Sequence, residues 1–235
     1  MEGIVFDAGP VISLSLNSLL FVVTELKKHY DGIFVITPAV KSELIDVPIK
    51  IKRFKLESLQ VLKLILDGTF HMVSDPKISA MRDKLSSLAN NIYSYNKNPI
   101  KILHSGELEA ISAAVILKMD TLVIDERTTR VLMESPRNLR ELLHKKLHKR
   151  IDVDSERLNE FLSYVKGIRI VRSAEFVAAA FRIGIIRKEV TSEGEDKIVP
   201  HLDSEILDSV LWGVKLKGCS ITESEIDSLE QFLHK

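Results

Sequence analysis

The chain has 235 residues, 45% of them hydrophobic, which is enough apolar material for a sizeable core. Its 33 basic and 33 acidic residues balance, so any affinity for nucleic acid or for an anionic membrane has to come from a local patch. The single cysteine, Cys219, excludes an internal disulfide and a cysteine-rich zinc site, and no apolar stretch reaches the roughly 20 residues of a membrane helix. We therefore expect a cytoplasmic protein without membrane contact.

Short apolar runs alternate with longer segments of helical spacing over the first 135 residues. The runs predict strands over 3–7, 32–37, 70–74 and 120–125. Apolar residues at three- and four-residue steps predict helices over 11–30, 105–119 and 126–135, with an inserted helical region near 52–66 and 78–95. This alternation indicates an α/β domain over residues 1–135 with a mainly parallel central sheet.

The residues after 135 indicate a mostly helical C-terminal extension, residues 136–235. Helices are predicted over 137–150, 154–165, 173–186, 203–217 and 222–234, with one strand over 167–172. Their apolar stripes suit packing on the same core as the first domain, or an interface with a partner.

Two aspartates stand where predicted strands end. Asp7 follows the run Ile4–Phe6, and Asp125 follows the run 121–124. Because the carboxyl ends of parallel strands meet at one edge of a sheet, the two carboxylates are expected at the same edge, where ligands of open α/β sheets bind. Either aspartate alone is equally well explained as a cap of the turn or helix that follows it.

Glutamates are predicted near the same edge. Pro38 suits the first turn of a helix after the second strand, which puts Glu43 about one and a half turns inside that helix. Glu107 and Glu109 open the alanine-rich helix predicted from residue 105. Glutamate also favours helix N-termini for simple dipole reasons, but a cluster of three or four carboxylates is the oxygen-rich environment that Mg²⁺ or Mn²⁺ accepts.

Four segments carry a resemblance to a known family: IVFDAGPVISL, TPAVKSEL, SGELEAISAA and TLVIDERTTR, in this order. Together they resemble the PIN-domain family, the metal-dependent ribonuclease fold of VapC-like toxins and RNA-processing nucleases, in its archaeal and bacterial branch that reads G-E-x-E-A. The resemblance implies a PIN-like three-layer α/β domain. It covers nearly all of residues 1–135 and does not extend into the tail.

The resemblance also implies the roles of the acids. Asp7, Glu43, Glu107 and Asp125 match the four catalytic positions, with Asp7, Glu107 and Asp125 as ligands of Mg²⁺ or Mn²⁺. Glu43 would accept the proton of the attacking water or act through a second shell. For the third position Glu107 fits the branch pattern best, while Glu109 lies nearer the Ile-Ser-Ala-Ala landmark.

The implied activity is endonucleolytic hydrolysis of single-stranded RNA, in RNA processing, decay or a toxin–antitoxin system. The alternative is a catalytically inactive PIN-fold scaffold that binds RNA or protein. The resemblance makes a homodimer, and an antitoxin or an RNA-processing protein, candidate partners besides RNA.

Substrate binding would depend on local positive charge. The candidates are six residues after the last acid: Arg127, Arg130, Arg137, Arg140, Lys145 and Lys146. The same charges would also suit a solvated surface helix whose cations pair with acids elsewhere. The run KIKRFK (50–55), with Phe54 among its cations, is a smaller candidate for RNA contact.

Overall fold

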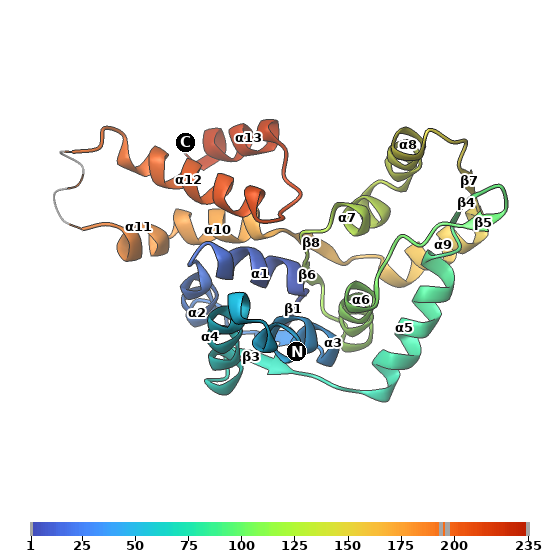
Figure 1. Ribbon diagram of the computed structural model, residues 1–235, viewed down its shortest axis with the longest axis horizontal. Coiled ribbons are helices and arrows are strands. Elements are labelled where there is room, and N and C mark those ends of the chain that lie inside the picture. Colours follow the sequence, from blue (N-terminus) through green and yellow to red (C-terminus); the bar gives the residue numbers. More distant parts are fainter. Residues whose placement is uncertain (1, 193–194, 196–197, 234–235) are drawn as a thin grey trace.

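The computed structural model of the chain describes residues 2–192, 195 and 198–233 (Figure 1). Its centre is a sheet with the strand order β3-β2-β1-β6-β8, in which every neighbouring pair is parallel. The strands are β1 (Gly3–Phe6), β2 (Ile33–Ile36), β3 (Phe70–Met72), β6 (Thr121–Val123) and β8 (Arg169–Val171). The protein is therefore an α/β protein, as predicted, and the arrangement is compatible with a three-layer α/β fold.

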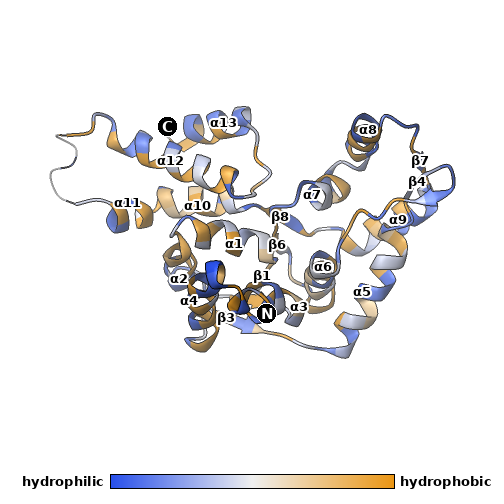
Figure 2. Ribbon diagram, in the orientation of Figure 1, coloured by the Kyte–Doolittle hydropathy of each residue, from blue (hydrophilic) through white to orange (hydrophobic). Residues whose placement is uncertain are grey.

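Alternating side chains of the strands enter two separate hydrophobic clusters. Phe6 and Phe34 belong to one, and Val5, Val35 and Leu122 belong to the other. Because successive residues of a strand point to opposite faces, near-continuous apolar runs are what a sheet covered on both sides requires. Figure 2 shows the matching orange colour on the elements around β1 and β3.

One face of the sheet packs on an aromatic cluster. The Phe6 ring centroid lies 5.0 Å from that of Phe34, 5.1 Å from that of Phe70 and 5.4 Å from that of Phe176. Helices that contribute buried residues to this face are α1 (Ala8–Leu16), α2 (Leu20–Lys28), α3 (Pro38–Lys41), α4 (Lys55–Leu66), α10 (Ser173–Arg182), α11 (Ile185–Val190), α12 (Leu202–Leu216) and α13 (Glu223–Leu233).

The other face packs on helices from the middle of the chain. They are α5 (Pro76–Ala89), α6 (Ser105–Leu117), α7 (Arg127–Glu134), α8 (Pro136–Leu147) and α9 (Ser155–Val165). The small residues Ala110, Ala113 and Ala114 of α6 are fully buried, which lets this helix approach the sheet closely. Helix α6 therefore holds its first turn next to the carboxyl edge.

Two predicted helices are divided in the structure. The segment 11–30 forms α1 and α2, joined around Ser18, whose positive φ of 58° breaks the helical path. The segment 173–186 forms α10 and the start of α11, separated at Gly184 with φ of 78°. Apolar spacing continues through both breaks, so periodicity could not reveal them.

The predicted helix over 78–95 is wrong in its last part. Helix α5 ends at Ala89, and β4 (Tyr93–Tyr95) pairs antiparallel with β5 (Asn98–Pro99) and with β7 (Asp152–Val153). Tyr93 is fully buried, and its hydroxyl donates to the Pro136 carbonyl at 2.9 Å. The pairing with β5 is local, but the pairing with β7 joins residues about 60 positions apart, and local sequence does not encode that contact.

The segment after residue 135 contributes to the same core as the first 135 residues. Strand β8 pairs with β6 within the central sheet, and Phe176 of α10 joins the aromatic cluster. No single helix among the described residues has the length and apolar character needed to cross a membrane; α1 and α2 pass that criterion only as a pair bent by 114°.

Candidate functional site

Asp7 lies at the junction of β1 and α1. It has extended backbone geometry and caps α1, with its Oδ2 accepting from the Gly9 backbone N–H at 3.3 Å. Only 6% of its surface is exposed. Burial is the largest cause that raises the pKa of Asp7, to about 7, and the nearby charge of Glu107 is the second. Backbone hydrogen bonds from Gly9 and Ala8 lower this pKa, and the charge of Glu43 raises it slightly.

Glu43 lies in a π-helical turn, η1 (Ser42–Asp46), that directly continues α3. Pro38 is the first residue of α3, as predicted, and the Thr37 hydroxyl caps it by accepting from Val40 N–H at 3.4 Å. The π-helical turn adds a residue to the helical path, and such turns recur at functional sites. Burial raises the pKa of Glu43, an effect partly offset by His104.

Glu107 occupies the third position of α6. Its Oε2 accepts from the backbone N–H of His104, the residue that caps this helix, at 2.8 Å. Ser105 is the first residue of the helix. Burial is the largest cause of the raised pKa of Glu107, about 6, and the charges of Glu126 and Glu43 raise it further.

Asp7, Glu43 and Glu107 therefore converge at the carboxyl edge of the sheet. The charges of Glu107 and Glu43 raise the pKa of Asp7, and the charge of Glu43 also raises that of Glu107. A glycine makes room for the group: a Cβ added at Gly106 would lie 2.4 Å from Glu43 Oε1, so a side chain there would displace the glutamate. Carboxylates this close repel one another when ionised, and a nearby cation would relieve that repulsion.

Asp125 lies beside this group, but its carboxylate is engaged elsewhere. Oδ1 accepts from the Ser173 backbone N–H at 2.7 Å, and Oδ2 accepts from the hydroxyls of Ser173 at 2.8 Å and Ser13 at 3.0 Å. A Cβ added at Gly9 would lie 3.5 Å from Asp7 Oδ2 and 3.7 Å from Asp125 Cβ, so the two aspartates flank Gly9. Asp125 thus joins β6 to α1 and α10, and its role as a metal ligand stays a prediction.

We expect Asp125→Asn to lower the free energy of unfolding by about 1–3 kcal/mol. An amide has one acceptor oxygen where the carboxylate accepts three hydrogen bonds, and its NH₂ group would face groups that now donate. Urea unfolding monitored by circular dichroism measures the change. Asp208→Asn, on an exposed position of α12, is the matched control and should be neutral; equal stability of both variants would contradict the anchoring role.

Glu109, the alternative third acid, is buried away from Asp7. Its Oε1 accepts from the Ala39 backbone N–H at 3.0 Å at the start of α3, and its Oε2 pairs with Arg82 at 3.3 Å. These contacts compensate its charge and tie α6 to α3 and α5. The charge of Glu109 still raises the pKa of Glu43. Of the two candidates, however, Glu107 is the one whose charge acts on Asp7.

Glu126 is a site residue that the sequence interpretation missed. It caps α7, with its Oε2 accepting from Thr129 N–H at 2.7 Å, and its charge acts on Glu107. The signal was present as the adjacent acids Asp125 and Glu126 after the strand. The apolar run points to the first of them, whereas in the structure the second is the one whose charge reaches Glu107.

The six predicted RNA-binding cations lie on α7 and α8 with different surroundings. Arg130 is half-buried and lies 3.7 Å from both Glu134 and Glu225, so its charge is compensated. Arg140 is exposed, and its Nε donates to the Ile151 carbonyl at 3.1 Å. The other four are exposed and form no ion pair within the part of the chain that the structure describes: Arg127, Arg137, Lys145 and Lys146. A pocket of about 270 Å³ between the two helices is lined by Arg127, Arg130 and Lys145 together with Glu134 and Glu141.

The chemistry of the acidic group fits a hard divalent cation. Carboxylate oxygens are the ligands that Mg²⁺ and Mn²⁺ prefer, and the space left by Gly106 lets the Glu43 carboxylate reach the group. Across the described residues, no three or more histidine, cysteine, aspartate or glutamate side chains have the arrangement needed to hold a metal ion.

We compared the chain with known protein families, curated proteins and solved structures. No protein-family model, no curated protein and no solved structure matches the chain.

Proposed function

We propose that this protein is a PIN-like, metal-dependent endoribonuclease of the cytoplasm that hydrolyses phosphodiester bonds of single-stranded RNA. The observation that supports it is the convergence of Asp7, Glu43 and Glu107 at the carboxyl edge of a parallel sheet, with Gly106 leaving room for the group. A divalent Mg²⁺ or Mn²⁺ ion bound there would activate a water molecule and stabilise negative charge on the transferred phosphate.

The three acids of the group would have different catalytic roles, set by their positions. Asp7, at the rigid end of β1, is the first candidate ligand, and Glu107 in the first turn of α6 is the second. Glu43, on the π-helical turn, would accept the proton of the attacking water, for which a carboxyl with a raised pKa is suited. Asp125 has both oxygens engaged, but Oδ1 accepts a single hydrogen bond, from the Ser173 backbone N–H, and this oxygen could still contribute to a cation site.

The alternative is a scaffold of the same fold that binds RNA or protein without cutting. The observation in its favour is the engagement of Asp125 by three hydrogen bonds, which gives this acid a structural use. Crowded carboxylates have no comparable use in a scaffold, because they destabilise the fold in the absence of a cation. We therefore favour the enzyme. A homodimer, and an antitoxin or RNA-processing partner, are part of this proposal by resemblance alone.

The test is incubation of the wild-type protein with end-labelled single-stranded RNA in Mg²⁺, in Mn²⁺ and in excess chelator. Cleavage that requires either metal, at internal positions, is the expected result. Binding of the same RNA without cleavage in any of the three conditions would favour the scaffold. Cleavage that persists in chelator would contradict the metal-dependent mechanism.

We further expect Lys145→Glu combined with Lys146→Glu to weaken RNA binding and to reduce its salt dependence. For every phosphate that the variant no longer neutralises, the slope of log affinity against log salt should fall by about 0.7 for a single strand. Fluorescence anisotropy over a salt series measures both quantities. Lys118→Glu combined with Lys166→Glu changes the same charge at the opposite, amino edge of the sheet; equal weakening in the two double variants would refute a specific role for α8.

A further inference from the structure

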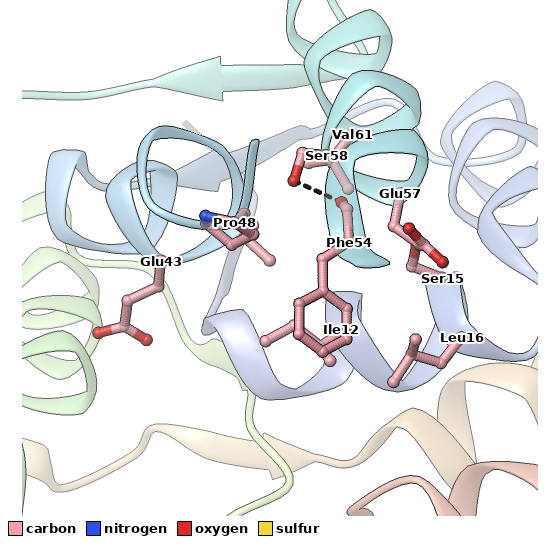
Figure 3. A pocket seen from close by; sticks show the side chains of 10 residues that line it. Ile12, Ser15, Leu16, Glu43, Pro48, Phe54, Glu57, Ser58 and Val61 are labelled. Carbon is pink, nitrogen blue, oxygen red and sulfur yellow. Dashed lines mark hydrogen bonds between the residues drawn. The ribbon is translucent and has the colours of Figure 1, made fainter. Parts of the chain in front are cut away.

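A pocket lies beside the acidic group, between α1, the turns that follow α3, and α4. Its volume is about 170 Å³, and its walls are almost wholly apolar, with Ile12, Leu16, Pro48 and Phe54 among the lining residues. Figure 3 shows the Phe54 ring in the middle of the pocket, with Glu43 at one end and Ser15 and Glu57 at the other. Glu43, to which we assign proton transfer, is therefore one of the residues that line this pocket.

Two polar atoms at the far end of this pocket have no partner. Ser15 Oγ and Glu57 Oε2 are buried and form no hydrogen bond in the structure, and residue Ser15 is only 8% exposed. Unpaired buried polar atoms are rare in folded proteins because their desolvation is not compensated. Glu57 can only accept hydrogen bonds when ionised, so its missing partner is a donor.

The segment of chain that supplies Pro48 and Phe54 to the pocket also carries exposed apolar residues and cations. Val47 precedes the turn η2 (Pro48–Lys50), and Ile51 lies between η2 and the turn η3 (Lys52–Phe54). The two residues are 55% and 45% exposed. The four cations of the run 50–55 form no ion pair within the described residues: Lys50, Lys52, Arg53 and Lys55. The Arg53 guanidinium lies 5.4 Å from the centre of the Phe54 ring.

An occupant of this pocket has to satisfy three conditions at once. It needs a flat apolar body to contact Phe54 and the aliphatic walls, N–H donors to reach Glu57 and Ser15, and negative charge outside the pocket to meet the four cations. Nucleotides of a single strand combine these features, and proteins bind them by stacking bases on aromatic rings beside a cationic track for the backbone. An apolar peptide side chain would satisfy the first condition only.

We propose that this pocket binds one nucleobase of single-stranded RNA, with Phe54 as the contact for its face, Ser15 and Glu57 as partners of its edge, and the cations of residues 50–55 as partners of the flanking phosphates. This proposal rests on the proposed function, because a nuclease of single-stranded RNA would have an RNA strand passing Glu43. Base recognition in the pocket positions the scissile phosphate at the acidic group.

The test uses Asp7→Asn protein, in which binding is measured without turnover, and a series of single-stranded RNAs in which one nucleotide at a time lacks its base. We expect removal of one particular base to weaken binding roughly 5- to 100-fold, and Phe54→Ala to weaken binding of intact RNA to a similar extent. The two effects should not add, because they remove the same interaction. Phe232→Ala, at a residue that is 61% exposed, is the matched control and should have no effect.

A second variant tests the edge of the base. Glu57→Gln replaces an acceptor by a group that also donates, so the preferred base at the sensitive position should change while overall stability, followed by thermal unfolding, does not. Unchanged preference in this variant, together with additive effects of Phe54→Ala and base removal, would overturn the proposal.

The results separate this proposal from the proposed function. Base-dependent binding through Phe54 without any cleavage by the wild type would retain the pocket and reject the nuclease. Metal-dependent cleavage with the same KM in wild type and Phe54→Ala would retain the nuclease and reject the pocket. Loss of a dimer on Phe54→Ala in sedimentation, with RNA binding intact, would assign the pocket to a second copy of the chain and also overturn the proposal.

Discussion

We expect Asp7→Asn to reduce metal-dependent RNA cleavage by at least about 100-fold. Asparagine has nearly the same shape and can still accept the Gly9 N–H hydrogen bond that caps α1, so the fold should be retained. The variant lacks the negative charge that a divalent cation requires at the rigid end of β1. The measurement is the initial rate of cleavage of end-labelled RNA in Mn²⁺ and Mg²⁺ at matched protein concentration.

The control for this prediction is Asp31→Asn. Asp31 is an exposed residue just before β2, at the opposite edge of the sheet, so its charge does not act at the acidic group. The control variant should cleave at the wild-type rate. If Asp7→Asn were as active as Asp31→Asn while both remained folded, the acidic group would not be the catalytic centre.

The second large effect concerns stability against pH in the absence of metal. The pKa of Asp7 is about 7 in the folded protein, against an ordinary value of 3.8, chiefly because the carboxyl is buried and secondly because Glu107 is near. Below pH 4 the carboxyl is protonated in both the folded and the unfolded chain. Between pH 4 and 7 only the folded chain retains the proton, so the free energy of unfolding falls as pH rises through this window, by up to about 4 kcal/mol.

Asp7→Asn should remove most of this dependence. The variant is expected to be more stable than the wild type at pH 8 and about equal to it below pH 4, because its amide cannot ionise. Glu107, whose pKa is raised to about 6, leaves a smaller slope of the same sign. Urea titrations of chelator-treated protein at several pH values measure the effect, and added Mn²⁺ should recover stability at pH 8.

The decisive quantity is the difference in free energy of unfolding between wild type and Asp7→Asn, because Glu25, Asp120 and Glu225 have lowered pKa values and contribute the opposite slope to both proteins. A difference that does not change between pH 4 and 7, without metal, would contradict the crowding of these carboxylates. Recovery by Mn²⁺ but not by an equal concentration of Na⁺ would distinguish binding from general screening, which acts on exposed charges.

Local sequence predicted the framework of the protein correctly. The apolar runs that contain β1, β2 and β6, and the helices α6, α7 and α9, follow from side-chain periodicity that is independent of distant contacts. The parallel sheet followed from their alternation, and the shared edge of Asp7 and Asp125 followed from the parallel order. Pro38 indicated the start of α3 through its own backbone chemistry.

The local sequence could not predict which partners each acid contacts in the folded protein. Glu107 and Glu109 are separated by one residue, and both suit the start of a helix. Only the packing of α6 against α3 and α5 turns Glu109 towards Ala39 and Arg82 and leaves Glu107 beside Asp7. In the same way, Ser173 engages Asp125 from 48 residues away, a contact that no local pattern encodes.

The sequence alone determined that strands ending in acids would alternate with helices, because those preferences belong to individual residues and their near neighbours. The tertiary structure decided which carboxylates face one another, which are compensated by a cation or a serine, and where strand β8 extends the sheet. These outcomes depend on side chains brought together by packing, since the energy of a charge is set by what surrounds it and not by its place in the chain.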